Sequence, residues 1–364
     1  MSSRRWTKLA EPLFRTGVRI RHEFYRRHLF RTRWLNHPVI SIGNLSVGGT
    51  GKSPLVRYFA GFLQEAGMAP AILSRGYRGT SESTNRLISD GNELLATPAE
   101  TGDEAWMLAR ILTGVPVAVG RCRWVSGRLI ERLNPDPDRV FLLDDGFQHL
   151  GLARDLDLVV CDATRPLQGE SLLPAGRLRE PPRALSRADG ILLTRCHLAE
   201  ARLAKIEEEI ESLAPEAPRF QFRTEAVALR DLGGQRTEEP SARAGCKGVV
   251  LAALGNPDQF VKDVALAGVK VVNEFLFRDH HPYTQEELDV VIERAHRLGA
   301  EFVVTTEKDV VRLEGLSFRG LPFLALDIRY RPAEPEKLHP WLLDRIRQVR
   351  ERSHPSSDRR GTKE

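Results

Sequence analysis

A glycine-rich turn near the N-terminus ends in a lysine and a serine, residue types that bind phosphate groups. The turn, SIGNLSVGGTGKSP over 41–54, follows an apolar strand and precedes a helical segment. In that position backbone N–H groups converge on one point, and the new helix adds the positive end of its dipole. Lys52 can then reach the β- and γ-phosphates of a nucleotide, and Ser53 can offer its hydroxyl to Mg²⁺. The alternative is a tight turn with an exposed lysine.

The turn departs from the usual phosphate-loop pattern at one corner. In G-x-x-x-x-G-K-[ST] the first glycine would fall at position 46, where this chain has a serine. The turn is wider at its entrance, so a small residue can serve there. We therefore predict nucleotide binding by the whole loop, which comprises Ser46, Val47, Gly48, Gly49, Thr50, Gly51, Lys52 and Ser53.

Two acidic pairs could supply the metal ligand that a phosphate loop needs. Asp144 and Asp145 end the apolar run VFLLDDG, and a strand beside the loop usually carries the acid for Mg²⁺. Adjacent side chains of a strand point to opposite faces, so only one of the two can sit directly on the metal. Asp103 and Glu104 begin a helical stretch, where N-capping explains one acid. The presence of both acids would be explained if one is a metal ligand and the other a general base. For the first pair the alternative is two solvated turn carboxylates.

A third group lies in the second half of the chain, in the loop FRDHHPYT. Asp279 precedes His280 and His281, and two histidines beside an aspartate suit general-base catalysis or metal binding. Surface histidines in a loop are the plain alternative. The later run TTEKD resembles guanine recognition by [NT]-K-x-D, but no residue separates Lys308 from Asp309. That mismatch argues against a GTPase.

Short apolar strands that alternate with helical stretches must position these groups. Strands rich in Val, Ile and Leu, separated by helices, indicate a parallel sheet covered on both faces. The fold class is therefore α/β, with a parallel-sheet domain of P-loop NTPase type, a second, smaller α/β domain and an N-terminal amphipathic helical segment. The predicted divisions are the N-terminal segment 1–37, the P-loop kinase domain 38–217, an inter-domain crossing 218–234, the second domain 235–349 and a disordered tail 350–364.

Charge is unevenly distributed along the chain. The net charge is +5, but residues 1–38 contain ten Arg and Lys against two acids and so account for +8, which leaves −3 for the remainder. Apolar residues recur at helical spacing in this leader, and a basic amphipathic helix can lie at the surface of an anionic membrane. Packing against the protein's own domain is an equal alternative, and a nucleic-acid arm is less favoured. The apolar residues are Leu9, Leu13, Phe14, Val18, Phe24, Tyr25, Leu29 and Phe30.

The composition excludes several other classes of protein. Four cysteines lie far apart and form no C-x-x-C pair, which argues against a disulfide framework or a thiolate zinc site. We see no secretory signal and no apolar run long enough to cross a bilayer.

Seven motifs in a fixed order resemble one family. They are GNLSVGGTGKSP, LSRGYRG, GDEAWMLA, LLDDGFQH, LLPAGRLREP, DHHPYT and TTEKD. From about Val39 to Lys308 they look like tetraacyldisaccharide 4′-kinase, a family that carries Ser or Thr where the standard loop has its first glycine. The resemblance implies two α/β domains with the active site in the cleft between them. It also implies transfer of the γ-phosphoryl group of ATP, with Mg²⁺, to the 4′-hydroxyl of a tetraacyldisaccharide 1-phosphate in lipid A biosynthesis.

The resemblance assigns metal and phosphate roles to matching positions. The loop would bind the nucleotide phosphates. Ser53, Glu104 and Asp145 would surround Mg²⁺ directly or through water, with Asp144 in support. Weaker contacts to phosphate or substrate are expected from Arg123, Gln148, Arg179 and Glu180.

The resemblance also implies a catalytic pair. Asp103 and His280 would form the base that activates the sugar hydroxyl, because an alcohol is a poor nucleophile and a positioned imidazole, oriented by a carboxylate, can take its proton. His280 is favoured over His281 because the family pattern places the histidine directly after Asp279. Transfer itself is mostly positioning and charge neutralisation, so Lys52 and the metal should dominate the rate.

The implied partners are an acylated glucosamine disaccharide 1-phosphate and the anionic membrane that holds it. The expected location is the cytoplasmic face of the bacterial inner membrane, peripheral or shallowly inserted. No nucleic acid and no obligate protein partner are expected. Two other functions stay open from the residues. One is a soluble P-loop NTPase such as a metallochaperone ATPase, and the other is a nucleotide-gated binding protein at the membrane.

Overall fold

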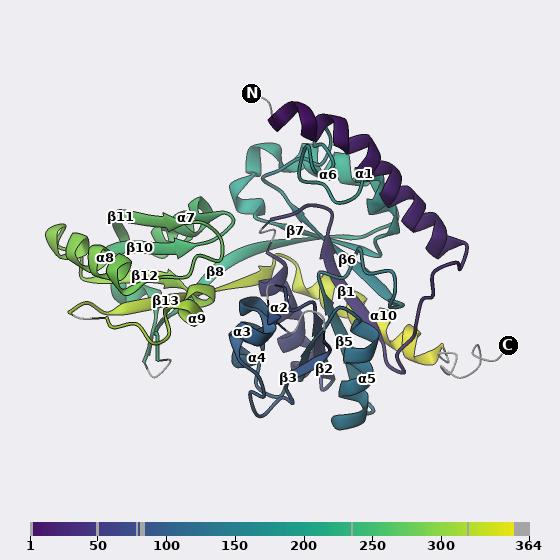
Figure 1. The fold of residues 1–364 in the computed structure, drawn as a ribbon, viewed down its shortest axis with the longest axis horizontal. Coiled ribbons are helices and arrows are strands. Elements are labelled where there is room, and N and C mark those ends of the chain that lie inside the picture. The colour runs from purple at the N-terminus through teal and green to yellow at the C-terminus, as the bar shows by residue number, and fades with distance from the viewer. Residues whose placement is uncertain are drawn as a thin grey trace. The chain divides into compact units, whose positions relative to one another are not determined.

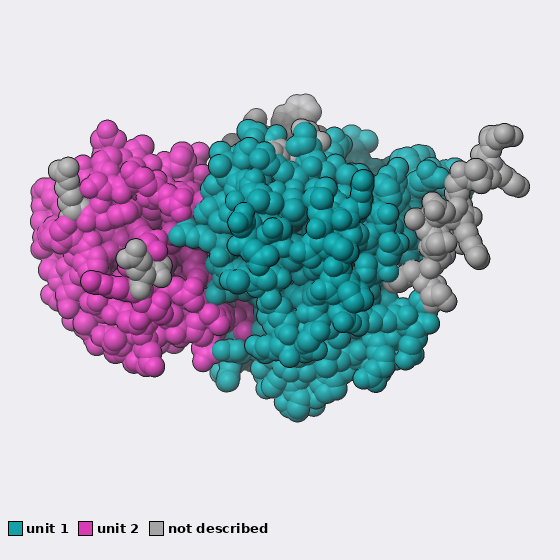
Figure 2. All heavy atoms as spheres, turned by 90° about the horizontal axis from the view of Figure 1, so that it is seen from below, with its two compact units in different colours: residues 1–223, 331–364 teal, residues 224–330 magenta. Residues whose placement is uncertain are grey.

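The computed structural model describes residues 3–48, 51–77, 79–80, 84–233, 236–318 and 320–352 (Figure 1). The chain divides into two compact units, which Figure 2 colours teal and magenta. Unit 1 comprises Met1–Arg223 and Arg331–Glu364, and unit 2 comprises Thr224–Tyr330. Unit 2 is therefore an insertion in the sequence of unit 1.

Unit 1 is built on a sheet in the order β8-β7-β6-β1-β5-β2-β4-β3. Its pairings are parallel except that β3 runs antiparallel to β4 at the edge. Every residue of β1, β5, β6 and β7 is buried, as expected for strands covered on both faces. The strands are β1 (Val39–Asn44), β2 (Ala69–Ser74), β3 (Arg86–Ser89), β4 (Val117–Val119), β5 (Arg139–Asp144), β6 (Leu156–Asp162), β7 (Gly190–Thr194) and the first part of β8 (Arg219–Asp231).

The helices of unit 1 follow the strands in sequence and pack on them. The helix after β1, α2, contacts β1, β2 and β5 through a buried apolar stripe that includes Leu55, Phe59 and Leu63. Residue spacings of three and four along α2 place these side chains on one face. The helices are α1 (Ser3–Arg26), α2 (Lys52–Glu65), α3 (Pro98–Thr101), α4 (Asp103–Ile111), α5 (Arg123–Leu133), α6 (Glu200–Leu213) and α10 (Pro335–Glu351), with 3₁₀ turns η2 (Pro182–Arg187) and η3 (Cys196–Leu198).

The leader forms α1, which lies on unit 1 along one of its faces. Residues 11, 14, 18, 22 and 25 are half-buried, and the spacing of these positions follows one side of a helix. Phe14 packs against the core cluster of β6 and β7. Leu13, Ile20 and Phe24 are exposed on the other side, so the apolar residues predicted for one membrane-facing stripe are divided between two faces.

Within the described residues, no helix combines the length and the apolar composition that crossing a bilayer requires.

In unit 2 four strands pair in parallel in the order β11-β10-β12-β13, and β13 neighbours β8. Successive residues of β10 enter two different apolar clusters, because strand side chains alternate between faces. Val249 and Leu251 pack with Val291 of α8, whereas Val250 packs with Val264 of α7. The elements are β9 (Thr237–Glu238), η4 (Pro240–Arg243), β10 (Lys247–Ala253), α7 (Pro257–Leu266), β11 (Lys270–Phe277), α8 (Gln285–Arg297), β12 (Phe302–Thr306), α9 (Glu307–Leu313) and β13 (Phe323–Pro332).

The predicted α/β fold is confirmed, but the structure differs from the predicted boundary of the second domain at 349. From Arg331 onward the chain returns to unit 1. There α10 buries an apolar stripe, and His339 stacks on Phe62 of α2 with ring centroids 4.0 Å apart. The predicted crossing at 218–234 is mostly the long strand β8. The predicted tail begins inside α10, at Arg350, and its residues from 353 onward lie outside the described residues.

Candidate active site

The phosphate-loop residues lie between β1 and α2, at the carboxyl end of a strand flanked by β5 and β6. Gly48 has φ 104° and Gly51, which caps α2, has φ 86°. Both values lie in the left-handed region that glycine adopts without a steric cost. Ser46 instead forms an isolated antiparallel bridge with Leu178, so its backbone is extended and needs no glycine. Gly49 and Thr50 lie outside the described residues.

Backbone hydrogen bonds fix the entrance of the loop to the segment that contains Leu178. Val47 N donates to Arg177 O at 2.8 Å, and Arg179 N donates to Leu45 O at 2.7 Å. These bonds involve main-chain atoms on both sides of the Ser46 bridge. The motif LLPAGRLREP therefore holds the loop in place, a role that its sequence did not reveal.

Lys52 is the first residue of α2, and its ammonium group lies beside two side chains at the end of the sheet. Lys52 Nζ donates to Asn44 Oδ1 at 3.1 Å. It is 3.4 Å from Asp145 Oδ1. Ser53 follows Lys52 in the first turn of α2. The cation and the hydroxyl therefore lie at a helix N-terminus, a position that favours phosphate groups.

Asp145 joins three of the predicted residues in one hydrogen-bonded network. Arg179 Nη1 donates to Asp145 Oδ2 at 2.6 Å and is 3.3 Å from Gln148 Oε1. Gln148 Nε2 donates to Asn44 O at 3.0 Å. Burial alone would raise the pKa of Asp145, but Lys52 and Arg179 hold the pKa below its usual value. Asp145 is therefore an ionised carboxylate near the loop.

Asp144 differs from its neighbour because it is the buried last residue of β5. Ser74 Oγ donates to Asp144 Oδ2 at 3.0 Å. Burial, together with the charges of Glu104 and Asp145, raises the pKa of Asp144 to about 6. Three of the predicted acids thus repel one another electrostatically at this edge of the sheet, a condition that a bound cation would relieve.

Asp103 and Glu104 lie in the first turn of α4, which starts against the loop of the LSRGYRG motif. Gly102 precedes them with φ 84°. A Cβ at this position would lie 2.4 Å from the carbonyl oxygen of Tyr77, so no larger residue fits without moving backbone. This close approach ties the start of α4 to the segment that follows β2.

The acids of this region suit Mg²⁺ better than a metal ion whose ligands all come from the protein. Among the described residues, no group of three or more His, Cys, Asp or Glu side chains could hold a metal ion. Mg²⁺ usually takes one or two carboxylates and completes its shell with water and substrate phosphates. The oxygen donors present match that preference. They are the hydroxyl of Ser53 in the first turn of α2, the carboxylate of Glu104 in the first turn of α4, and the carboxylates of Asp144 and Asp145 at the end of β5.

Glu180 has partners that the sequence did not predict. It is only 2% exposed and lies 3.0 Å from His22 Nε2 of α1 and 2.8 Å from Arg187 Nη1. Burial opposes its ionisation, but these two partners lower the pKa of Glu180 to about 2. In the structure Glu180 connects the leader helix to unit 1.

Arg123 begins α5 and is buried in an arginine-rich region around His149. Burial, followed by the charges of Arg123, Arg154, Arg21 and Arg75, lowers the pKa of His149 to about 3. The side chain of His149 is therefore neutral at physiological pH. His149 belongs to the motif LLDDGFQH, but nothing in the sequence indicated that it is surrounded by cations.

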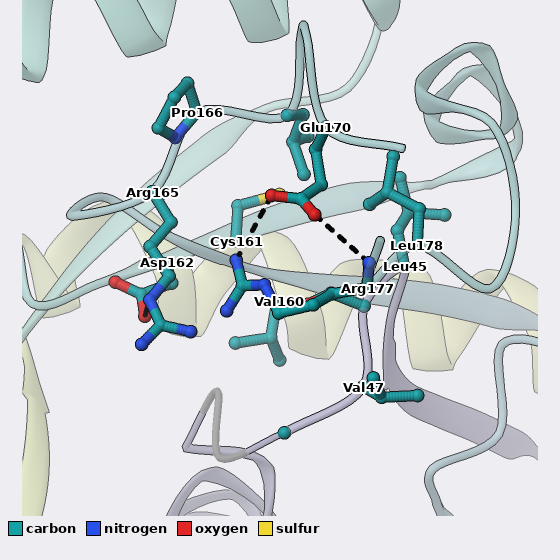
Figure 3. A pocket seen from close by; sticks show the side chains of 13 residues that line it. Leu45, Val47, Val160, Cys161, Asp162, Arg165, Pro166, Glu170, Arg177 and Leu178 are labelled. Atoms are coloured by element: carbon teal, nitrogen blue, oxygen red, sulfur yellow. Dashed lines mark hydrogen bonds and ion pairs between the residues drawn. The ribbon is translucent and has the colours of Figure 1, made fainter. Parts of the chain in front are cut away.

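A pocket borders the first half of the loop in unit 1 (Figure 3). Figure 3 shows Glu170 facing Arg177, whose backbone N–H donates to Glu170 Oε1 at 3.1 Å. Arg165 lies near Asp162, at the end of β6. The two cations of this lining, Arg165 and Arg177, each pair with one of its carboxylates, Asp162 and Glu170. The pocket is lined by Leu45, Ser46, Val47, Gly48, Val160, Cys161, Asp162, Arg165, Pro166, Leu167, Glu170, Arg177 and Leu178.

The two adjacent histidines of unit 2 have different surroundings. His281 Nε2 lies 3.0 and 2.9 Å from the two carboxylate oxygens of Glu287, and its ring stacks on Phe277. His280 has φ 65° and its Nδ1 lies 3.1 Å from Arg312 Nη2. A guanidinium group donates and never accepts, so His280 must accept at Nδ1. In that hydrogen bond the ring proton is on Nε2, which lies 3.8 Å from Asp279 Oδ1.

The predicted pair of Asp103 and His280 is divided between the units. Asp103 belongs to unit 1 and His280 to unit 2. Their association therefore remains a prediction, whereas Lys52, Asp145, Gln148 and Arg179 are connected within unit 1.

Comparison with known proteins decides the family. A family model described as tetraacyldisaccharide-1-P 4′-kinase matches residues 4–347. The chain belongs to the tetraacyldisaccharide-1-P 4′-kinase family. A tetraacyldisaccharide 4′-kinase of Syntrophus aciditrophicus is 39% identical over 329 residues, which span 88% of this chain and 87% of that protein. One of Geobacter metallireducens is 40% identical over 312 residues, 85% and 89% of the two chains.

A solved structure of the same family supports the fold over nearly the whole chain. It is the crystal structure of an "apo" form of the Aquifex aeolicus kinase LpxK in complex with ATP. The likeness has a TM-score of 0.73 at 30% identity and covers 92% of this chain and 97% of the other. A kinase of this family accounts for the loop, the acids and the motif order together. The metallochaperone and nucleotide-gated alternatives are not favoured.

Proposed function

We propose that this chain transfers the γ-phosphoryl group of ATP to the 4′-hydroxyl of an acylated glucosamine disaccharide 1-phosphate, the step that makes the 4′-phosphorylated precursor of lipid A. Membership of the kinase family supports this reaction. The structural observation that carries it is the position of Lys52, at the N-terminus of α2 and 3.4 Å from Asp145.

The loop residues supply the binding of the triphosphate. Backbone N–H groups at the N-terminus of α2, those of Gly51, Lys52 and Ser53, would donate to phosphate oxygens, and the Lys52 ammonium would neutralise the charge that develops on the transferred group. Asn44 and Asp145 hold the ammonium group near the end of β1. Because the loop entrance is fixed by backbone bonds to residues 177–179, little reorganisation is needed when the nucleotide binds.

Ser53, Glu104 and Asp145 are the proposed holders of Mg²⁺, with Asp144 in support. When bound, Mg²⁺ would supply the positive charge that offsets the negative charge of the phosphates during transfer. The electrostatic influence of Glu104 and Asp145 on the pKa of Asp144 supports the grouping of these acids. The protein's own contribution is to keep Asp145 ionised through Lys52 and Arg179.

Activation of the sugar hydroxyl is assigned to Asp103 and His280. The sequence suggested that the imidazole takes the proton and that the carboxylate orients it. The contact with Arg312 favours the reverse division, because a ring that accepts at Nδ1 presents a protonated Nε2. In the proposed pair Asp103 takes the proton of the 4′-hydroxyl, and His280 orients and polarises the carboxylate as a donor.

Helix α1 is the proposed contact with the membrane that contains the acceptor. Its outer side exposes Leu13, Ile20 and Phe24, and exposed arginines such as Arg15 and Arg26 lie on the same helix. Apolar side chains enter the headgroup region while cations contact anionic lipids. The proposed location is the cytoplasmic face of the inner membrane.

Incubation with γ-labelled ATP, Mg²⁺ and the acceptor lipid tests the reaction directly. The label should move to the lipid, whereas an ATPase of another class would release only labelled phosphate. Lys52→Ala should lower transfer by about 10²- to 10³-fold, because one charge-stabilising donor is lost. Lys337→Ala removes an exposed lysine of α10 that pairs with Glu334 and should behave as wild type. Transfer by Lys52→Ala at the wild-type rate would refute the role of the loop.

A further inference from the structure

The motif TTEKD ends in α9, and the structure connects this helix to the loop that carries His280. Lys308 and Arg312 are four residues apart, a spacing that puts two side chains on one face of a helix. Lys308 Nζ lies 3.2 Å from Asp279 Oδ1, and Arg312 Nη2 lies 3.1 Å from His280 Nδ1. Two consecutive residues of the loop are thus held by two cations of one helix. Lys308, Asp309 and Arg312 are termed the α9 bracket.

Asp309 is the buried residue of the α9 bracket that holds Arg312 in place. Its side chain is fully buried and accepts from Ala253 N at 3.1 Å and from Thr306 Oγ1 at 2.7 Å. Arg312 Nη1 donates to Asp309 Oδ1 at 2.9 Å and to Ala253 O at 3.2 Å. One guanidinium nitrogen is therefore fixed to the end of β10, which leaves Nη2 in a defined position toward His280.

The loop that the α9 bracket holds has a strained backbone. His280 has φ 65°, a conformation that is uncommon for residues other than glycine. Such conformations persist where the surroundings over-determine them, and they cluster at functional sites. The neighbouring His281 is held by another route, through Glu287 of α8, whereas Lys308 contacts Asp279 and Arg312 contacts His280.

We propose that Arg312 and Lys308 are positioning residues that hold His280 as a neutral donor for phosphoryl transfer. The proposal rests on the catalytic role proposed for His280. Arg312 can only donate, so it excludes a proton from Nδ1 and fixes the Nε2–H tautomer. Lys308 holds Asp279 and keeps the strained loop in place. The TTEKD motif, which does not match the pattern of guanine recognition, obtains its function from this contact.

A double-mutant cycle separates positioning from general stability. Arg312→Gln should lower kcat about 10- to 100-fold, because a displaced catalytic group loses that much rate. The KM for ATP should change little, since the phosphate loop lies in unit 1. In the His280→Ala background the same change should have almost no further effect. Arg297→Gln, an exposed arginine of α8 that pairs with Glu293, is the matched control and should leave kcat unchanged.

Two outcomes of the cycle are distinguishable. An equal loss of kcat from Arg312→Gln with and without His280 would overturn the positioning role. Wild-type turnover of His280→Ala would overturn the proposed catalytic role of His280 and this proposal with it.

The tautomer can be measured without altering Arg312. Nitrogen-15 spectra of the wild-type protein labelled at histidine, with His280 assigned from its loss in His280→Ala, should show an unprotonated Nδ1 and a protonated Nε2. Lys308→Met, a variant that leaves the Asp309–Arg312 pair intact, should weaken this preference and lower kcat. A protonated Nδ1 in the wild-type protein would overturn the proposal even where Arg312→Gln fails to fold.

Discussion

The serine at position 46 shows that the backbone conformation of each position, rather than the residue-type motif, decides where the loop needs glycine. Ser46 is extended and bridges to Leu178, so any small residue can occupy this corner. Gly48 has φ 104°, so its replacement by another residue costs conformational energy that a replacement of Ser46 does not. The requirement for glycine belongs to those positions of the loop that have positive φ.

Gly48→Ala tests that distinction in the loop. An added Cβ would meet no atom within 4 Å, so the cost is conformational alone. Placing a non-glycine residue in the left-handed region costs about 1–2 kcal/mol. We expect the KM for ATP to rise about tenfold, since 1.4 kcal/mol corresponds to a factor of ten.

Ser46→Ala is the matched control, measured in the same steady-state assay. It should bind ATP nearly as the wild type does. Equal defects in the two variants would contradict the assignment of conformational roles.

The chemistry of single residues was predictable only where the partners are close in sequence or fixed by the fold. The position of the glycine-rich turn between a strand and a helix, and of Asp144 and Asp145 at the end of a buried strand, could be predicted because neighbours in the sequence determine it. The partners of Glu180 and His280 could not, since His22 and Arg312 approach through tertiary packing. The sequence signal for this contact is limited to the spacing of Asp309 and Arg312. They are three residues apart, about one helical turn, which predicts that the two side chains pair on one face of a helix.

Strands and helices followed from the alternation of apolar runs in the sequence. The apolar run that ends in Asp144 and Asp145 was predicted as a strand beside the loop, and the structure has the buried strand β5 there, paired with β1. The return of α10 to unit 1 was not predicted, because its apolar stripe is compatible with any partner surface. The local residue pattern predicts whether a segment is a helix or a strand. The surface against which that segment packs depends on residues that are distant in the sequence.

The docking of α1 through Glu180 gives a pH-dependent contribution to stability. The pKa of Glu180 is about 2, below the ordinary value of 4.5. A carboxyl with a depressed pKa stabilises the folded state above its unfolded pKa, and this contribution is lost as pH falls from about 4.5 toward 2. Glu180→Gln should therefore lower the free energy of unfolding by roughly 2–3 kcal/mol at pH 7. Urea denaturation measures the difference, which should shrink below about pH 4.5.

Glu23→Gln provides the control on the same helix. Glu23 pairs with Arg26 and Arg27 at the solvent-exposed side of α1, where water and salt screen the interaction. Its replacement should change stability little at any pH. A Glu180→Gln effect of constant size from pH 7 to pH 4 would show that the ion pairs with His22 and Arg187 are not its cause.

At the scale of the whole molecule, binding to the membrane should depend on the outer side of α1. Leu13→Ser combined with Ile20→Ser should weaken binding to anionic vesicles about 10- to 100-fold, because each large apolar side chain contributes about 1.5–3 kcal/mol when fully buried and less when partly buried. Sedimentation with vesicles measures this, and rising salt should weaken the wild-type binding further. Leu266→Ser removes an exposed leucine of α7 in unit 2 and should have no effect. Loss of binding in that control, or salt-independent retention of the wild type, would contradict the surface-helix account.

The central claim, that the loop beginning at Ser46 transfers phosphate to one hydroxyl of a lipid disaccharide, is tested most directly by an acceptor blocked at that position. Wild-type protein should transfer label from γ-labelled ATP to the natural acceptor and not to the same lipid carrying a 4′-O-methyl group. Lys52→Ala should label the natural acceptor about 10²- to 10³-fold more slowly and the blocked lipid not at all. Labelling of the blocked lipid, or wild-type labelling by Lys52→Ala, would contradict the account.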